Sequence, residues 1–450
     1  MNGATAGTVV VVGAGWAGLA AAVGLVESGR QVVLIDAAPV AGGRARSLML
    51  PLDEHARIEV DNGQHLLIGA YRSTLALIRR VGVDPDAVLA RRRMALIGPG
   101  GFALHAAPLP APFNLAVGLL TARGFPWRER LAMVRAMASI RAGGIDDMPR
   151  GLTVADWLAA RAQPPALVER VWAPLCIGAL NTPLDRACAR AFAQVLRDAL
   201  LSTAADADFL LPRTTLGDVL PGPALAWLRA RGTDVRLRTT CRAVVRTAGG
   251  WQLDTDAGPL SADAVVLAVP PPQVVRLLAP AVPPPRLAAF ARFEHEPIAT
   301  VWLAWRARLA LPEVVMLEER LDTAEHGQWM FGRAAPTAGP MASVAGVVVS
   351  AAGRLDARPD ALAAGVSRQV AAQLGLPEPD WSRGIVERRA TIRCEPDRPR
   401  IDTDALADIA PGLALAGDWS WHRYPATIES AVRSGDAAAR WLVNGIATRP

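Results

Sequence analysis

The hydrophobic positions at the start of the chain follow the pattern of two buried strands joined by a helix. Residues 8–13 are a run of valines bounded by glycine, which is typical of a parallel strand buried on both faces. Residues 14–28 place small and apolar side chains at helical spacing and stop at Gly29. Residues 31–36 form a second apolar run of strand length. Together these segments predict a βαβ unit.

The later hydrophobic pattern predicts a second kind of domain. Helical spacing dominates residues 74–201, whereas residues 233–247 and 250–256 alternate like an antiparallel pair of strands. Other strand-like runs and a final amphipathic helix cover residues 262–269, 298–305, 316–317, 345–350, 413–416 and 427–443. We therefore expect an α/β fold with a discontinuous Rossmann-type cofactor domain and an inserted substrate domain that mixes sheet and helix. The expected boundaries are 1–73, 210–287 and 400–450 for the first, and 74–209 and 288–399 for the second.

The composition is that of a large globular protein, and it excludes several functions. The 450 residues are 51% apolar and 20% charged, which excludes a disordered chain. All 48 residues of the lysine-plus-arginine total are arginine. Without lysine, pyridoxal-phosphate enzymes and P-loop ATPases are excluded, because both need one. The net charge of +6 is modest for this length, and we expect no nucleic-acid partner.

The cysteines and the N-terminus bear on the compartment. Cys176, Cys188, Cys241 and Cys394 show neither a CxxC pair nor a zinc-binding spacing, so we expect no metal and a reduced environment. The N-terminus lacks the basic segment and cleavage signal of a secretory leader, and we expect a cytoplasmic protein. The uncharged residues 94–122 are broken by prolines and cannot form one spanning helix. This stretch is either a buried part of the substrate domain or a surface that dips into a membrane.

The junction between the first strand and the first helix carries a dinucleotide-binding signature. Gly13 permits the tight turn, Gly15 lets a pyrophosphate approach the backbone, and Gly18 allows close packing of helix on strand. The N–H groups at the helix N-terminus favour the phosphate. Asp36 closes the second strand at the spacing of a ribose-binding acid. The predicted cofactor contacts here are Gly13, Ala14, Gly15, Trp16, Ala17, Gly18 and Asp36.

Three further segments resemble the FAD-binding loops of the phytoene desaturase and amine oxidase superfamily. A glycine pair with an arginine follows the ribose acid, residues 61–65 resemble the segment beside the isoalloxazine ring, and a late strand ends in Gly-Asp before the last helix. The resemblance implies FAD, and the dipole of that last helix would favour negative charge on the reduced ring. It implies cofactor contacts at Gly42, Gly43, Arg44, Gly63, Gln64, Cys241, Gly417, Asp418, Thr427, Ile428, Glu429 and Ser430.

Other segments resemble a narrower group, the squalene-associated flavoproteins of bacterial hopanoid biosynthesis, which are hydroxysqualene dehydroxylases. Residues 172–183 (WAPLCIGALNTP) and 61–65 (DNGQH) are the more specific matches, with 195–198 and 210–213 beside them. The resemblance implies that reduced FAD gives a hydride to hydroxysqualene, a C30 isoprenoid, as its allylic hydroxyl leaves and squalene forms. A long apolar tunnel is then needed, for which we predict Trp172, Cys176, Asn181, Trp421 and Tyr424 as substrate residues.

Such a reaction needs a proton donor near the leaving hydroxyl. His65 follows the ring-side glycine and titrates near neutral pH, so we predict it as the acid. Glu429 is a second candidate, and Asp61 and His422 are weaker ones.

Three other interpretations stay open. They are a carotenoid or phytoene-type desaturase, a non-catalytic flavin-binding partner of terpenoid synthases, and an amine oxidase. The last is disfavoured, because amine oxidases of this fold commonly hold a water at the flavin with a lysine. FAD takes the one glycine-rich loop, so nothing in the sequence supports direct NAD(P)H binding, and the electron donor stays unidentified. Contact with the inner face of the cytoplasmic membrane, and with upstream synthases of the squalene pathway, are hypotheses that follow from an insoluble substrate.

Overall fold

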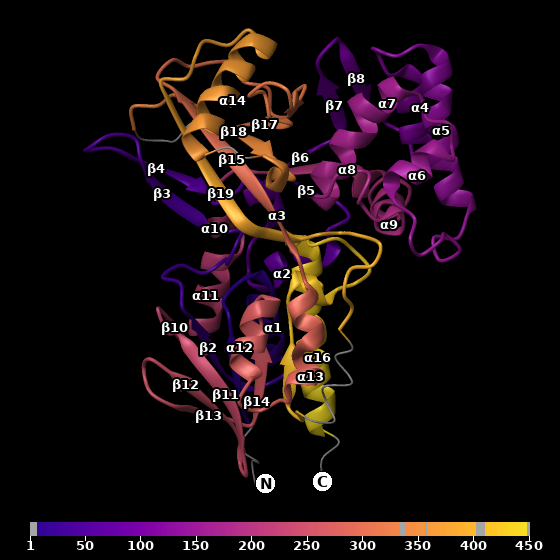
Figure 1. The fold of residues 1–450 in the computed structure, drawn as a ribbon. Helices are drawn as coiled ribbons and strands as arrows, with labels where there is room; N and C mark the ends of the chain where they lie inside the picture. The colour runs from indigo at the N-terminus through magenta and orange to yellow at the C-terminus, as the bar shows by residue number, and fades with distance from the viewer. Residues whose placement is uncertain (1–6, 334–338, 356–357, 402–409, 448–450) are drawn as a thin grey trace.

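One half of the molecule is built on a five-stranded parallel sheet, which occupies the lower part of Figure 1. The structure is a computed structural model that describes residues 7–333, 339–355, 358–401 and 410–447. The first strand has a neighbour on each side, so its valines are buried on both faces. In spatial order the strands are β10 (Asp234–Leu237), β2 (Gln31–Asp36), β1 (Thr8–Val12), β14 (Ala264–Leu267) and β20 (Leu413–Leu415).

Two different layers cover the faces of this sheet. Val9 and Val11 pack with the helices of one layer, while Val10 and Val12 pack with the other, which combines an antiparallel sheet and helices. The helical layer contains α1 (Trp16–Glu27), α2 (Arg72–Arg80), α3 (Pro85–Val88), α10 (Leu216–Val219), α11 (Pro221–Arg229) and α16 (Ile428–Ala447). The mixed layer contains β11 (Cys241–Thr247), β12 (Gly250–Thr255), β13 (Leu260–Ala262), α12 (Pro271–Leu278) and α13 (Pro284–Leu287).

The other half contains a second, antiparallel sheet of five strands. Alternate residues of β15 (His295–Trp305), among them Val301 and Leu303, pack against α14 (Pro359–Leu374), whereas Ile298 and Thr300 point to the opposite side. In spatial order its strands are β16 (Val315–Met316), β17 (Trp329–Arg333), β18 (Ser343–Val349), β15 (His295–Trp305) and β19 (Trp381–Ile392). The ribbon β3 (Ser47–Pro51) and β4 (Arg57–Asp61) packs on that opposite side through Trp302.

A third group of elements forms one extremity of the molecule, at the upper right of Figure 1. Its core is a cluster of apolar side chains around Trp157, Trp172 and Phe192, whose rings meet edge to face. Its strands are β5 (Leu67–Ile68), β6 (Leu89–Arg92), β7 (Ala95–Gly98), β8 (Phe102–His105) and β9 (Phe209–Pro212). Its helices are α4 (Phe113–Thr121), α5 (Trp127–Ala142), α6 (Val154–Ala159), α7 (Pro165–Leu167), a π-helical turn (Val168–Trp172), α8 (Ala173–Leu180) and α9 (Ala189–Leu200).

The predicted fold class is confirmed, with two local corrections. Residues 233–247 are not one arm of a hairpin: β10 runs parallel to β2, and only β11 pairs antiparallel with β12. Between them Arg238 adopts a φ of 56°, and its N–H donates to the Ala38 carbonyl, which turns the chain out of the main sheet. Within residues 74–201, where helical spacing dominates, β6 is a strand that was not predicted, whereas β7 and β8 lie in the proline-broken residues 94–122. The two-domain boundaries stay a prediction.

Candidate functional site

The three glycines of the first turn have three different environments. A Cβ on Gly13 would lie 2.4 Å from the Ala268 carbonyl oxygen, and its φ is 107°. A Cβ on Gly18 would lie 1.8 Å from the Gly13 carbonyl oxygen, because α1 packs directly on the turn. Around Gly15, by contrast, the nearest atom to an added Cβ is the Gly43 Cα, at 3.9 Å. The first two glycines therefore shape the turn, and Gly15 leaves an open space beside the helix N-terminus.

Asp36 and the glycine pair hold this turn in place. The Asp36 carboxylate accepts hydrogen bonds from the backbone N–H groups of Ala14 (2.6 Å) and Ala38 (2.7 Å). Gly42 donates its N–H to the Ala14 carbonyl, with a φ of 111°. The second glycine-rich segment thus lies directly against the first, although 27 positions separate Gly15 from Gly42 in the numbering.

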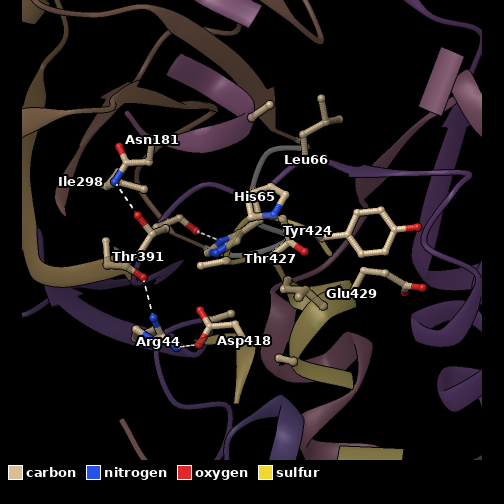
Figure 2. A pocket seen from close by; sticks show the side chains of 18 of the residues that line it. Arg44, His65, Leu66, Asn181, Ile298, Thr391, Asp418, Tyr424, Thr427 and Glu429 are labelled. Carbon is tan, nitrogen blue, oxygen red and sulfur yellow. Dashed lines mark hydrogen bonds and ion pairs between the residues drawn. The ribbon is translucent and has the colours of Figure 1, made fainter. Parts of the chain in front are cut away.

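Arg44 connects the N-terminal and C-terminal parts of the site. Its guanidinium donates to the Asp418 carboxylate at 2.6 Å and to the Ala390 carbonyl at 2.7 Å, as Figure 2 shows in part. Asp418 follows Gly417, whose N–H donates to the Ser434 hydroxyl on α16. An ion pair between the half-buried Arg44 and the buried Asp418 therefore joins the loop after β2 to the loop after β20.

One continuous cavity of about 720 Å³ begins at these loops and extends into the helical extremity. At one end it is lined by backbone and polar groups of the glycine-rich turns, and at the other mainly by apolar side chains. The apolar end includes Met94, Leu96, Leu104, Leu115, Leu119, Met133, Met137, Trp172, Phe192, Phe209 and Phe331. The cavity thus offers a polar channel and an apolar chamber that open into each other.

His65 lies in the pocket shown in Figure 2, where the polar channel and the apolar chamber meet. Its Nδ1 is 2.6 Å from the Gly63 carbonyl oxygen. A carbonyl only accepts, so Nδ1 carries a proton, and Nε2 is unprotonated when the imidazole is neutral. Burial lowers the pKa of His65 below its ordinary value, against the opposing effects of the Gly63 carbonyl and Asp61.

Residues 16–443 match the model of one protein family, described as flavin containing amine oxidoreductase. The chain belongs to this family. It is an FAD-dependent oxidoreductase. Solved structures also share its fold. Cyclohexylamine oxidase from Brevibacterium oxydans superposes with a TM-score of 0.71 at 16% identity, covering 98% of this chain and 100% of that one. A putative protoporphyrinogen oxidase from Exiguobacterium gives 0.66 at 18% identity, covering 97% and 99%.

The sequence is also similar to curated proteins, some of them along nearly its whole length. Hydroxysqualene dehydroxylase of Rhodopseudomonas palustris is 29% identical, over 96% of this chain and 97% of that protein. The enzyme of the same name from Zymomonas mobilis is 26% identical, over 95% and 97%. A probable zeta-carotene desaturase of Synechococcus elongatus is 28% identical, but over only 53% of this chain and 51% of that protein. The resemblance to the hydroxysqualene dehydroxylases is confirmed.

The polar channel has the features that FAD requires of this family's fold. The open space at Gly15 would receive the pyrophosphate beside the N-terminus of α1, and Asp36, the predicted ribose-binding acid, lines the same cavity. The N-terminus of α16 is capped by the Thr427 hydroxyl, which accepts from the Ser430 N–H at 3.1 Å. When bound, FAD supplies the hydride chemistry, and the chain's own residues orient the reactants and handle the protons.

Most of the predicted site residues line this one cavity. They are Gly13, Gly15, Trp16, Ala17, Asp36, Gly42, Gly43, Arg44, Gly63, Gln64, His65, Trp172, Asn181, Cys241, Gly417, Asp418, Tyr424, Thr427, Ile428 and Glu429. The described part of the chain places five others outside its lining, namely Ala14, Gly18, Cys176, Trp421 and Ser430. Among these, Cys176 is fully buried in the helical core, 3.9 Å from the Thr182 carbonyl oxygen. The individual roles of all these residues stay predictions.

Glu429 has a structural use that the sequence did not reveal. Its carboxylate accepts hydrogen bonds from the N–H groups of Ser73 and Thr74, the Thr74 hydroxyl and the Arg433 guanidinium. Ser73 and Thr74 belong to the first turn of α2, so Glu429 satisfies the free donors at that helix end. We therefore keep His65 as the candidate acid.

Asn181 and Tyr424 are also engaged by the protein. The Asn181 amide donates to the Thr391 hydroxyl at 2.8 Å and accepts from the Ala351 N–H at 2.6 Å, while Asn181 ends α8 in the left-handed conformation. The Tyr424 hydroxyl donates to Asp198 at 2.5 Å, and burial together with this carboxylate raises its pKa to about 12.

Several lining residues escaped the sequence analysis. The antiparallel sheet contributes three of them, Thr300, Trp329 and Glu387. Glu387 lies on β19, which has charged residues at positions where a buried strand would be apolar. Thr300 lies on an apolar strand that was predicted, but its side chain carried no motif. The alternation of that strand was the one signal that could have shown which face Thr300 occupies.

Proposed function

We propose that this protein reduces hydroxysqualene to squalene with FAD as the hydride donor. The observation that carries the proposal is the apolar chamber that opens directly onto the FAD channel, in a chain similar over its full length to enzymes named hydroxysqualene dehydroxylase. The substrate would be a C30 isoprenoid alcohol, whose chain needs apolar walls and whose hydroxyl must lie at the channel end. The partial match to carotene desaturases gives less support to a desaturase.

The reaction balances as an alcohol, a hydride and a proton giving a hydrocarbon and water. The allylic C–O bond breaks with both electrons going to oxygen, which takes a proton and leaves as water. The hydride then completes the C–H bond at the carbon that has lost the oxygen. The protein must donate that proton and exclude water from the cation, and the apolar chamber supports the second task.

Anaerobic mixing of the photoreduced holoenzyme with hydroxysqualene tests this proposal. We expect the flavin to reoxidise within one turnover as an equal amount of squalene appears. Bleaching of the oxidised holoenzyme by phytoene would instead identify a desaturase. No redox change with either compound would identify a non-catalytic flavoprotein.

His65 is expected to be the proton donor, so the single-turnover rate should depend on its protonation. A general acid must be protonated, and the protonated fraction of His65 rises as pH falls toward its pKa, which burial lowers from about 6.5. The rate should therefore increase as pH falls, by about tenfold per pH unit while the pH is above that pKa. His65→Gln should slow the reaction by about 100-fold or more and remove this dependence.

The charged groups that affect the pKa of His65 are Asp61 and Arg44, so Asp61→Asn is the matched control. This variant keeps the imidazole and should keep the pH dependence, with its midpoint displaced to lower pH because a favourable charge is lost. Stopped-flow measurement of flavin reoxidation gives the single-turnover rate of both the His65→Gln and the Asp61→Asn variants. Unchanged single-turnover rates in His65→Ala and His65→Gln would remove His65 as the acid.

We also propose that the outer side of α4 contacts a lipid bilayer. Phe113, Val117 and Leu120 form an exposed stripe on this helix, while Leu115 and Leu119 on its other side line the apolar chamber. The exposed Trp127 begins the next helix. Among the described residues, no helix is long and apolar enough to cross a membrane. α4 is therefore a wall one helix thick between the chamber and a surface suited to lipid.

The charges around this surface favour an anionic bilayer. Between Asp86 and Glu129 the chain contains no acidic residue and five arginines, namely Arg91, Arg92, Arg93, Arg123 and Arg128. Arg123 and Arg128 are exposed on either side of Trp127, where they would meet lipid phosphates. An insoluble isoprenoid could then reach the chamber from the bilayer without crossing water.

A further inference from the structure

Thr300 is a polar side chain in a place where the protein provides it with no partner. It lies in the middle of β15, is 1% exposed, and lines the cavity. Its Oγ1 is buried and has no hydrogen-bond partner among the residues that the structure describes. A buried hydroxyl without a partner is unfavourable, so native proteins keep one mainly where a ligand or water completes it.

The Thr300 hydroxyl and the His65 imidazole flank the same point of the cavity. A Cβ built on Gly63 would lie 3.5 Å from the His65 Cε1 and 3.6 Å from the Thr300 Oγ1. His65 is held there by its Nδ1 contact with the Gly63 carbonyl, and Thr300 is held by β15, which pairs with a strand on each side. Both groups are thus fixed by backbone, at the junction of the polar channel and the apolar chamber.

The surroundings make this the place where a ligand hydroxyl would be bound. Ile298, two residues earlier on the same side of β15, and Val348, opposite Thr300 in the sheet register, also line the cavity and offer no polar group through their side chains. Asn181, which was predicted as a substrate residue, has its amide occupied by Thr391 and Ala351. Among the described residues that line the cavity, Thr300 Oγ1 is one of the buried polar atoms whose hydrogen bond is still to be made, together with Gln64 Oε1, Gln273 Oε1 and Trp329 Nε1. Of these it is the hydroxyl, and it faces the His65 imidazole across Gly63.

We propose that Thr300 and His65 together form the binding site for the hydroxyl group of the substrate, an inference that rests on the proposed function. The Thr300 hydroxyl donates to the substrate oxygen. In the neutral state the substrate hydroxyl donates to Nε2 of His65, and in the protonated state Nε2–H donates to the substrate oxygen. When the C–O bond breaks, the oxygen keeps the bonding electrons, takes the Nε2 proton and leaves as water.

Thr300→Val tests this site, because valine keeps the shape of the side chain and removes the hydroxyl. The measurement is the dissociation constant of the oxidised holoenzyme for hydroxysqualene and for squalene, from the change in flavin absorbance. We expect the wild type to prefer the alcohol, and Thr300→Val to reduce this preference by about tenfold through weaker alcohol binding. Thr300→Ser, which retains a hydroxyl, should keep most of the preference for the alcohol.

Ile298→Val is the matched control on the same strand. It removes one methyl group from the cavity wall and should weaken both ligands equally, leaving their ratio unchanged. An unchanged ratio in Thr300→Val, or no preference for the alcohol in the wild type, would overturn the proposed site. So would a loss of FAD content in Thr300→Val, because the hydroxyl would then serve the cofactor. Failure of the photoreduced wild type to form squalene would overturn the proposed function, and this is a separate measurement.

Discussion

Gly15→Val should yield a folded protein that lacks FAD. Gly15 has a φ of −73° and a ψ of 177°, which valine adopts readily, and an added Cβ would meet no atom nearer than 3.9 Å. The side chain would instead fill the space where the pyrophosphate approaches the backbone. We expect FAD affinity to fall by at least about 100-fold, or ~2.7 kcal/mol. The ratio of flavin to protein absorbance after purification, and titration of the apoprotein with FAD, measure this.

The comparison that isolates the effect is wild-type protein stripped of FAD. Bound FAD stabilises the folded state by mass action, so the variant should melt with the stripped protein and below the holoenzyme. Gly151→Val is the control substitution, because nothing lies within 4 Å of an added Cβ there and Gly151 is not among the residues that line the cavity. A Gly15→Val protein that retains one FAD per chain would contradict the assignment of this space to the pyrophosphate.

The cofactor end of the site could be predicted from the sequence because its chemistry is local. Gly13, Gly15 and Gly18 act through backbone geometry within a single turn, and the packing of α1 on that turn gives each a recognisable position. Asp36 is the last residue of β2, which pairs with β1, so its distance along the chain from the glycine turn predicts its position beside that turn. Such short-range constraints produce a recognisable sequence motif. The resemblance to a superfamily added Arg44 and Asp418 to the predicted cofactor contacts.

The substrate end could not be predicted in the same detail, because its walls come from segments that meet only in the folded protein. Trp172 reaches the cavity from the helical extremity and Thr300 from the antiparallel sheet, and no spacing relates them. Cys176 belongs to the most specific motif, yet lies in the core one helical turn from Trp172. Glu429 follows the expected helix start, but its partners at the end of α2 were invisible in the sequence.

The orientation of α4 was similarly beyond the sequence. Residues 94–122 were expected to be either buried in the substrate domain or a surface that dips into a membrane. Within this stretch, α4 has one side that lines the chamber and one side that is exposed, and the contact of the exposed side with a membrane is our proposal. Helical spacing alone separates Leu115 and Leu119 from Phe113 and Leu120, but proline-rich flanks hid where the helix begins. Only the structure shows that Leu115 and Leu119 line the apolar chamber.

Replacing Phe113, Leu120 and Trp127 together by serine should greatly weaken binding to anionic lipid vesicles. These side chains are 64%, 50% and 66% exposed, so their loss removes apolar surface without opening the core. If insertion of each contributes about 1 kcal/mol, less than full burial would, the variant should bind about 100-fold more weakly. Arg123→Gln with Arg128→Gln should weaken binding about 10- to 30-fold on anionic vesicles and leave neutral vesicles unaffected.

Met49→Ser with Leu321→Ser is the matched control, because these residues are 54% and 57% exposed on other elements. Vesicle flotation measures binding, and single-turnover assays with substrate in detergent or in vesicles measure access to the chamber. The serine variant should lose activity on vesicle-embedded substrate and keep it on detergent-dispersed substrate, since none of its three positions lines the cavity. Equal flotation of the serine variant and the wild type would refute docking through α4, and equal loss with both substrate forms would show that this helix serves the chamber alone.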